Sequence, residues 1–287
     1  MISIIIPAHN EQNVIARCIC AMLDGASPGE LEVLVAANGC TDQTADIARG
    51  FGLPVIVIES PVASKSRALN LADQAARGFP RFYVDADVVL TYDAIVKVAD
   101  VLRQGNVLAA APAVKFDVTG RPWTVRAFYS IWSALPYLRS GMIGSGVFAL
   151  SEAGRKRFES FPRLTADDAF ARLHFSRHER QIVESCSFTV STPRSLRGVV
   201  DIKTRSHFGN FELRQHFPDL WKNEEVNHSG VLARIALDPR RWPALLVYFY
   251  VKVMTRARTR WKFAYGDHRG WERDETSRQA AAADGNT

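Results

Sequence analysis

Short apolar runs alternate with helical patterns through the first part of the chain. The runs are rich in β-branched residues, which favours strands, and the segments between them repeat apolar residues every three or four positions, which favours helices. The predicted strands are 2–6, 31–36, 55–58 and 81–84. The predicted helices are 11–23, one that begins near Thr41 with Thr41 or Thr44 as its cap, 64–77 and 92–103. This alternation is typical of a parallel sheet covered by helices.

The regular alternation of strands and helices ends after Val107. There an apolar stretch, an aromatic region and a glycine-rich strand over 141–150 predict a mixed α and β structure. We therefore expect one α/β domain over residues 1–235, with a nucleotide-binding half (1–110) and a second half (111–235). A basic, aromatic helical segment is expected over 236–272. The polar, alanine-rich end, 273–287, is expected to be disordered.

Composition and charge narrow the class of protein. Of the 287 residues 47% are hydrophobic, which is enough for a sizeable core. The net charge of +6 favours anionic partners. Four cysteines in a chain of this length form no disulfide framework, so a reduced, cytoplasmic compartment is expected. The first residues lack the basic start of a signal peptide, and the apolar segment Trp242 to Met254 falls short of the roughly 20 residues that cross a bilayer, so no transmembrane helix is predicted.

Candidate ligand-binding residues follow the predicted strands at the edge of the sheet where open α/β proteins bind ligands. They are Pro7, Ala8, Asn10 and Glu11 after the first strand, Asn38 after the second, Lys65 after the third, and Asp85, Ala86 and Asp87 after the fourth. In an extended backbone Asp85 and Asp87 would project to the same side and share Mg²⁺ or Mn²⁺. Lys65 and Arg67, at a helix N-terminus, could meet a phosphate.

The ordered set of motifs resembles family 2 glycosyltransferases of the GT-A fold. It comprises Ile-Ile-Ile-Pro-Ala-His-Asn-Glu (4–11), Asn-Gly-Cys-Thr-Asp-Gln-Thr (38–44), Lys-Ser-Arg-Ala-Leu-Asn (65–70), Asp-Ala-Asp (85–87) and the pair Asp167-Asp168. The resemblance covers roughly residues 1 to 175 and leaves the last hundred weakly covered. It implies a Rossmann-like, mostly parallel central sheet flanked by helices, with a mixed acceptor-side half and C-terminal helices.

The resemblance also implies an inverting transfer of a sugar from a nucleotide diphosphate to an acceptor hydroxyl. Pro7, Ala8, Asn10 and Glu11 would hold the nucleoside, Asn38 would face the base, and Lys65 would lie near the base or the phosphates. Asp85, with Ala86 beside it, would reach the ribose or the metal, and Asp87 would bind the metal directly. Gly144, Ser145 and Gly146 would lie under the donor sugar and the acceptor, where a side chain would occupy substrate space.

The transfer needs a base beside the acceptor hydroxyl, and Asp168 matches the second acid of the family's acidic pair. Asp167 would orient the substrate or raise the pKa of its neighbour. The same two acids would also suit an ordinary helix N-terminus.

Two departures from the family pattern bear on the substrates. Ala37 and Asn38 replace the paired acids of many relatives, which leaves both a UDP-sugar, the favoured donor, and a GDP-sugar open. The Gln-x-x-Arg-Trp signature of processive synthases is absent, and Lys203 and Arg205 are only a loose basic substitute near the diphosphate. A single-transfer enzyme is therefore expected, with a glycan, a lipid-linked molecule or a small molecule as acceptor.

Proteins of other functions could share some of these sequence features. A catalytically silent relative, acting as a sugar-nucleotide-binding or membrane-associated scaffold, would not need both acidic pairs. A nucleotidyltransferase should open with a glycine-rich basic loop, which this chain lacks. The aromatic and basic segment from Trp242 to Lys262 suits an anionic membrane surface, on the inner face of the membrane, as well as a helix packed on the core. No motif accompanies it that would indicate nucleic-acid binding.

Overall fold

A computed structural model describes residues 1–136, 138, 146–224 and 230–265. Within these residues, eight strands form one sheet in the order β3-β2-β1-β4-β7-β6-β8-β5. They are β1 (Ile2–Ala8), β2 (Leu31–Asn38), β3 (Val55–Ser60), β4 (Arg81–Val84), β5 (Val88–Val89), β6 (Ala109–Asp117), β7 (Val147–Leu150) and β8 (Arg180–Ser191). The first three strands and β4 are parallel, as are β6 and β8, while β7 and β5 run antiparallel to their neighbours. The α/β fold with a mostly parallel sheet is confirmed.

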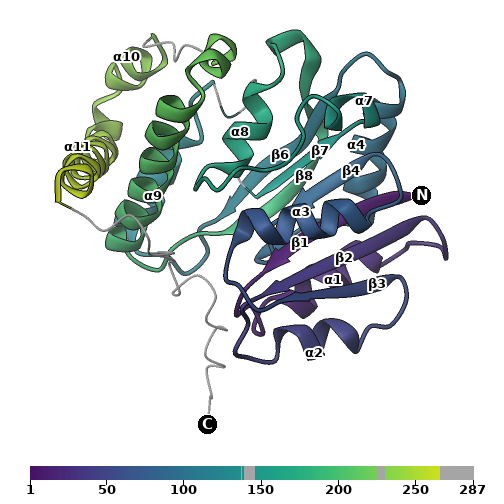
Figure 1. Ribbon diagram of the computed structural model, residues 1–287. Helices are drawn as coiled ribbons and strands as arrows, with labels where there is room; N and C mark the ends of the chain where they lie inside the picture. Colours follow the sequence, from purple (N-terminus) through teal and green to yellow (C-terminus); the bar gives the residue numbers. More distant parts are fainter. Residues whose placement is uncertain (137, 139–145, 225–229, 266–287) are drawn as a thin grey trace.

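Helices cover both faces of the sheet (Figure 1). They are α1 (Ile15–Leu23), α2 (Thr44–Arg49), α3 (Lys65–Ala75), α4 (Tyr92–Arg103), α5 (Trp123–Trp132), α7 (Glu152–Arg155), α8 (Asp167–Leu173), α9 (Leu196–His216), α10 (Gly230–Ala236) and α11 (Trp242–Tyr265). Short 3₁₀ turns are η1 (Arg177–Glu179), η2 (Pro218–Asn223) and η3 (Pro239–Arg241). Because β1 and β2 are covered on both faces, all their residues are buried and most of them are apolar.

The core has three parts. One face of the sheet packs against α1 and α4, and the other packs against α3 and α8. A third cluster joins α5, α9 and α11 beyond the sheet, so the basic C-terminal helix packs on the second half of the chain. In Figure 1, α10 and α11 lie at the edge of the molecule beyond α9, away from β2 and β3.

Most predicted elements of the first half agree with the structure, and their ends differ for local reasons. The helix predicted from residue 11 begins at Ile15, because Glu11 to Val14 form a turn in which the Val14 N–H donates to the Glu11 carbonyl (3.0 Å). Neither predicted threonine caps α2. Its cap residue is Gln43, and the Thr44 hydroxyl instead accepts the Glu11 N–H (2.7 Å).

The second half departs further from the sequence prediction. Only Val147–Leu150 of the predicted glycine-rich strand is seen as β7, and residues 141–145 lie outside the described part. The long helix α9 and the strand β8 were not predicted. The predicted tail 273–287, and the end of the predicted segment 236–272, also lie outside the described residues. No helix in the described ranges is both long and apolar enough to cross a membrane.

Candidate functional site

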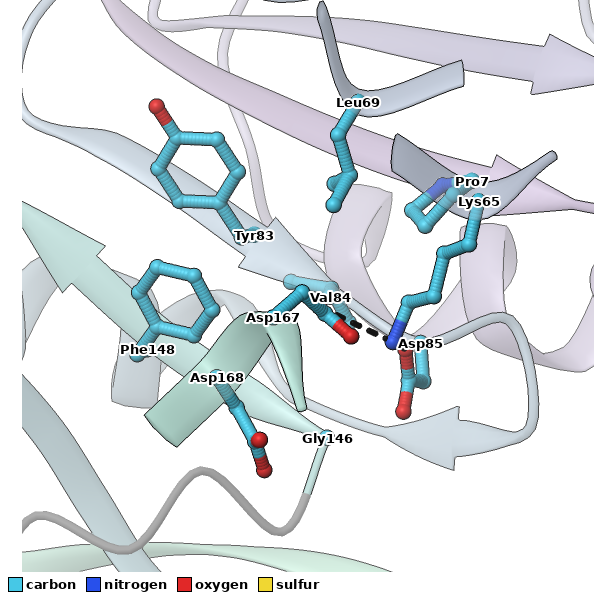
Figure 2. A pocket seen from close by; sticks show the side chains of 10 residues that line it. All are labelled: Pro7, Lys65, Leu69, Tyr83, Val84, Asp85, Gly146, Phe148, Asp167 and Asp168. Carbon is cyan, nitrogen blue, oxygen red and sulfur yellow. Dashed lines mark ion pairs between the residues drawn. The ribbon is translucent and has the colours of Figure 1, made fainter. Parts of the chain in front are cut away.

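A pocket opens at the carboxyl ends of β1 and β4, where the parallel sheet meets the N-termini of α3 and α8 (Figure 2). Its lining combines one cation, three carboxylates, one glycine and an apolar wall. The lining residues are Pro7, Lys65, Leu69, Tyr83, Val84, Asp85, Gly146, Phe148, Asp167 and Asp168. Motifs that are far apart in the sequence therefore meet in one place.

Lys65 is the link between these motifs. It is the first residue of α3, and its Nζ lies 2.8 Å from Oδ1 of Asp85 and 3.1 Å from Oδ2 of Asp167. Burial alone would lower the pKa of Lys65, but the charges of Asp167 and Asp85 raise it above its ordinary value. The side chain is therefore a permanent ammonium at neutral pH, held between the strand-end carboxylate and the acidic pair.

Asn38 holds the residue that precedes this lysine. Its side-chain N–H donates to the Ala8 carbonyl (2.7 Å), and its side-chain oxygen accepts the N–H of Ser64 (2.9 Å). The Ser64 hydroxyl in turn accepts the Arg67 N–H and caps α3. Asn38 is only 1% exposed, so the structure gives its amide a role inside the protein instead of the predicted contact with a nucleotide base.

Asp167 and Asp168 open α8 but point in different directions. In Figure 2 the Asp167 carboxylate is directed at Lys65, and the Asp168 carboxylate points away from it, toward the side of Gly146. Burial raises the pKa of Asp167 although Lys65 opposes the effect. Burial, and next the charge of Asp167, raise the pKa of Asp168 to about 6. A carboxyl with this pKa is ionised at neutral pH and is more basic than an ordinary aspartate.

The Asp85 to Asp87 segment forms a turn and does not continue the strand. The Val88 N–H donates to the Asp85 carbonyl (3.2 Å), so the expectation of two acids on the same side of an extended backbone is wrong. Asp85 lines the pocket and Asp87 is not part of the lining. Buried Cys18 of α1 lies behind this turn, with its sulfur 3.8 Å from the Asp85 carbonyl.

Gly146 is required at its position by both space and backbone conformation. Its carbonyl accepts the Asp85 N–H (2.8 Å), and its φ of +104° lies in a region that favours glycine. A Cβ atom at this residue would lie 2.9 Å from Cγ2 of Val88 and 3.3 Å from Oδ2 of Asp85. The glycine therefore keeps the space beside Asp85 clear. Gly144 and Ser145 lie outside the described residues.

The donor set fits a metal only in combination with a substrate. Among the described side chains, no three of His, Cys, Asp or Glu gather as a metal site. Mg²⁺ and Mn²⁺ at nucleotide sites are commonly held by one or two carboxylates and complete their shells with water and phosphate oxygens. Asp85, which lines the pocket, and Asp87, two residues further along the same turn, are the carboxylates available for such a site.

The remaining predicted residues divide between the pocket and other places. Pro7 lines the pocket, and Ala8 is held beside it through Asn38. Asn10 has a positive φ of 52°, and its side-chain oxygen accepts the Thr41 N–H (2.8 Å), which joins the first two loops. Glu11 is buried at the start of the following turn. Ala86 is buried in the turn after Asp85.

Lys203 and Arg205 do not line this pocket. The Lys203 ammonium lies 3.0 Å from the centre of the Trp132 ring, on the side of α9 that faces α5. Burial, together with the charge of Lys252, lowers the pKa of Lys203 well below its usual range. The structure thus does not bring this lysine to the predicted diphosphate position.

Sequence reasoning missed the support of the pocket wall. Tyr83 stacks on Phe148, with ring centres 4.7 Å apart, and its hydroxyl donates to Asp73 (2.6 Å). Asp73 also pairs with Arg81 (2.9 Å) and Arg155 (2.7 Å), which ties α3, β4 and α7 together. A tyrosine within an otherwise apolar buried strand was the available signal, because a buried hydroxyl needs a partner.

Comparisons with known proteins agree with this geometry. Residues 3–157, more than half of the 287-residue chain, match the family model Glycosyl transferase family 2. A 4,4'-diaponeurosporenoate glycosyltransferase from Staphylococcus aureus is 26% identical over 194 residues, which cover 64% of this chain and 48% of the relative. The chain thus spans about half the length of the curated relatives it matches.

Solved structures share the fold. A mannosyltransferase from Pyrobaculum calidifontis in complex with GDP-Man and Mn²⁺ aligns with a TM-score of 0.61 at 19% identity, over 93% of this chain and 76% of the other. A glucosyl-3-phosphoglycerate synthase from Mycobacterium tuberculosis, in complex with Mn²⁺, UDP-Glc and glycerol 3-phosphate, aligns with a TM-score of 0.54 at 18% identity, over 75% and 79% of the two chains. The sheet order and the covering helices are thus of the GT-A kind.

Proposed function

Because the chain belongs to glycosyl transferase family 2, we propose that it transfers a sugar from a nucleotide diphosphate, with inversion at the anomeric carbon, to an acceptor hydroxyl. The observation that carries this proposal is the position of Lys65. Its ammonium joins Asp85, at the end of the nucleotide-binding half, to Asp167, beside the proposed base Asp168. Donor-side and acceptor-side groups thereby line one pocket.

On the donor side, residues of the first two loops hold the nucleoside and Lys65 approaches the diphosphate. Pro7, Ala8, Asn10 and Glu11 form the nucleoside side of this site. Asp87 and Asp85 hold Mg²⁺ or Mn²⁺, which when bound neutralises negative charge that develops on the diphosphate as it leaves. The proposed roles of Mn²⁺ and a sugar nucleotide are supported by the complexes of the two solved structures.

On the acceptor side, Asp168 takes the proton of the acceptor hydroxyl. The hydroxyl oxygen attacks the anomeric carbon, and the bond from that carbon to the diphosphate oxygen breaks, so the nucleoside diphosphate leaves with the bonding electron pair. A carboxylate pKa near 6 suits this role, since the group is ionised at neutral pH yet basic enough to accept a proton. Gly146, which keeps the space beside Asp85 clear, leaves room for the sugar and the acceptor.

We propose a UDP-sugar as donor and keep a GDP-sugar as the alternative. The side-chain amide of Asn38 already makes hydrogen bonds to Ala8 and Ser64 inside the protein. Recognition of the nucleotide base therefore has to come from other groups of the first two loops. The two solved structures were obtained with UDP-Glc and GDP-Man, respectively, which gives both donors a precedent. A direct comparison of UDP- and GDP-sugars decides between them.

Substitution of the proposed base tests the function. Asp168→Asn should reduce release of nucleoside diphosphate from the preferred donor, measured with Mn²⁺ and water as a slow acceptor, by at least about a hundredfold, the usual effect of losing general-base catalysis. Its affinity for the nucleoside diphosphate should stay within about twofold, because Asp168 lies on the acceptor side. Asp100→Asn, an exposed acid of α4, is the matched control and should retain full turnover.

Turnover by Asp168→Asn close to that of the unchanged protein would contradict the base assignment. The alternative is that the unchanged protein is a catalytically silent scaffold of the same fold. Tight binding of a sugar nucleotide, with no release of nucleoside diphosphate from any UDP- or GDP-sugar, would favour that alternative.

A further inference from the structure

The C-terminal helix α11 carries apolar side chains on two opposite faces. One face packs on α5 and α9 through Leu245, Tyr248 and Val251, which are all buried. Buried Thr255 and Thr259 continue the same side. At 100° per residue, the helix directs a second set of apolar residues away from this packed face. The second face is therefore not needed for the core.

The second face is exposed over several turns. Trp242, Leu246, Phe249 and Val253 recur at a spacing of three or four residues and are between 50% and 72% exposed. Tyr250 and Trp261, 52% and 63% exposed, lie along its border. We refer to these six residues as the outer apolar face. Single exposed apolar residues are ordinary, but a continuous stripe with two tryptophans marks an interaction surface.

Positive charge flanks this face on one side. Lys252, Arg256 and Arg260 are exposed and follow one another at a spacing of four residues, next to Phe249 and Val253. Residues 239–265 contain no acidic residue. Although part of the Lys252 side chain is exposed, partial burial and next the charge of Arg256 lower its pKa, and burial with Lys252 and Arg256 lowers the pKa of His207 on the adjoining α9. These groups repel one another, and a nearby anion would relieve that repulsion.

We propose that the outer apolar face of α11 docks on an anionic bilayer surface, with its aromatic and aliphatic side chains in the interface and its basic stripe against lipid headgroups. Aromatic residues beside arginine and lysine are the combination that an anionic bilayer surface attracts. A second copy of the chain would instead bring two basic stripes together. The helix lies on the membrane and does not cross it, in keeping with the absence of a spanning helix from the described residues.

Vesicle flotation tests this inference without any reference to catalysis. The full chain should float with vesicles of equal parts phosphatidylglycerol and phosphatidylcholine, and it should not float with vesicles of phosphatidylcholine alone. Leu246→Ser with Phe249→Ser should weaken binding at least tenfold. The matched control is Leu53→Ser, an 89% exposed apolar residue before β3, which should bind as the unchanged chain does.

A second pair of variants tests the charge. Arg256→Gln with Arg260→Gln should weaken binding by about fivefold for each charge removed, and added salt should weaken binding by the unchanged chain. Lys97→Gln with Arg103→Gln, on α4, should leave binding unchanged. Because all these side chains are exposed or half-buried, unfolding should not intervene, and circular dichroism of each variant checks this.

Equal flotation with neutral and anionic vesicles, or no flotation with either, would overturn the proposal. So would a stable dimer, detected by sedimentation, that Leu246→Ser with Phe249→Ser dissociates, since the outer apolar face would then join two copies of the chain.

Discussion

At the scale of single residues, the proposed base Asp168 makes the pH dependence of the proposed transfer predictable. Burial and Asp167 raise the pKa of this carboxyl to about 6, and a base acts only when it is deprotonated. The kcat/KM of transfer should therefore fall about tenfold for each pH unit below about 6, and level off above it. A profile measured at constant ionic strength checks this prediction, and a flat profile down to pH 5 would exclude Asp168 as the base.

Four charged residues that line this pocket could be identified from the sequence, but their pairing could not. Lys65 and Asp85 are identified by their place after predicted strands, and Asp167 and Asp168 by the resemblance to the family's acidic pair. Nothing in the sequence says that the Lys65 ammonium lies between Asp85 and Asp167, because that depends on how three separate loops fold over one another. The resemblance assigns Asn38 to the nucleotide base, and the sequence does not show its hydrogen bonds to Ala8 and Ser64, because these contacts join residues far apart in the chain.

At the scale of elements, Gly146 decides how β7 meets the turn after β4. Gly146→Ala should lower the free energy of unfolding by about 1–3 kcal/mol more than Gly105→Ala does, the usual cost of overpacking. Both glycines have a positive φ, +104° and +78°, but only a Cβ at Gly146 would meet Val88, and Gly105 has open space around it. Urea denaturation of the two variants measures the difference. Equal losses would mean that the contact with Val88 is relieved without cost.

The elements that could be predicted have strong local signals. The bounds of α4, Tyr92–Arg103, agree with the prediction because its apolar spacing is regular and Thr91 caps it. In contrast, β8 alternates buried and exposed residues irregularly and has a register shift opposite Pro112 and Ala113 of β6. The helix α9 carries polar residues around much of its surface, since it packs on several neighbours through small patches. Whether these two segments form a strand or a helix therefore depends on tertiary contacts more than on local sequence.

At the scale of the whole molecule, the fold class could be predicted because the alternation of strands and helices limits the topology to few choices. The antiparallel insertion of β7 between β4 and β6 could not be predicted, since it brings residues 147–150 beside 81–84 from far along the chain. That insertion places Gly146 and Phe148 in the pocket. The wall that contains Gly146 and Phe148 thus depends on topology, whereas Lys65 and Asp85 lie in local motifs after predicted strands.

We propose that this pocket binds a nucleoside diphosphate with the help of a metal held by Asp85 and Asp87. The most direct measurement is the thermal unfolding midpoint of the protein with UDP, GDP, CDP or dTDP, each with and without Mn²⁺, repeated with Asp87→Asn. A ligand that binds only the folded state raises the midpoint by mass action. We predict a Mn²⁺-dependent rise with UDP, or with GDP if the alternative donor is the true one, which Asp87→Asn abolishes. No rise with any nucleotide, or the same rise in Asp87→Asn, would contradict this metal-dependent binding of a nucleoside diphosphate.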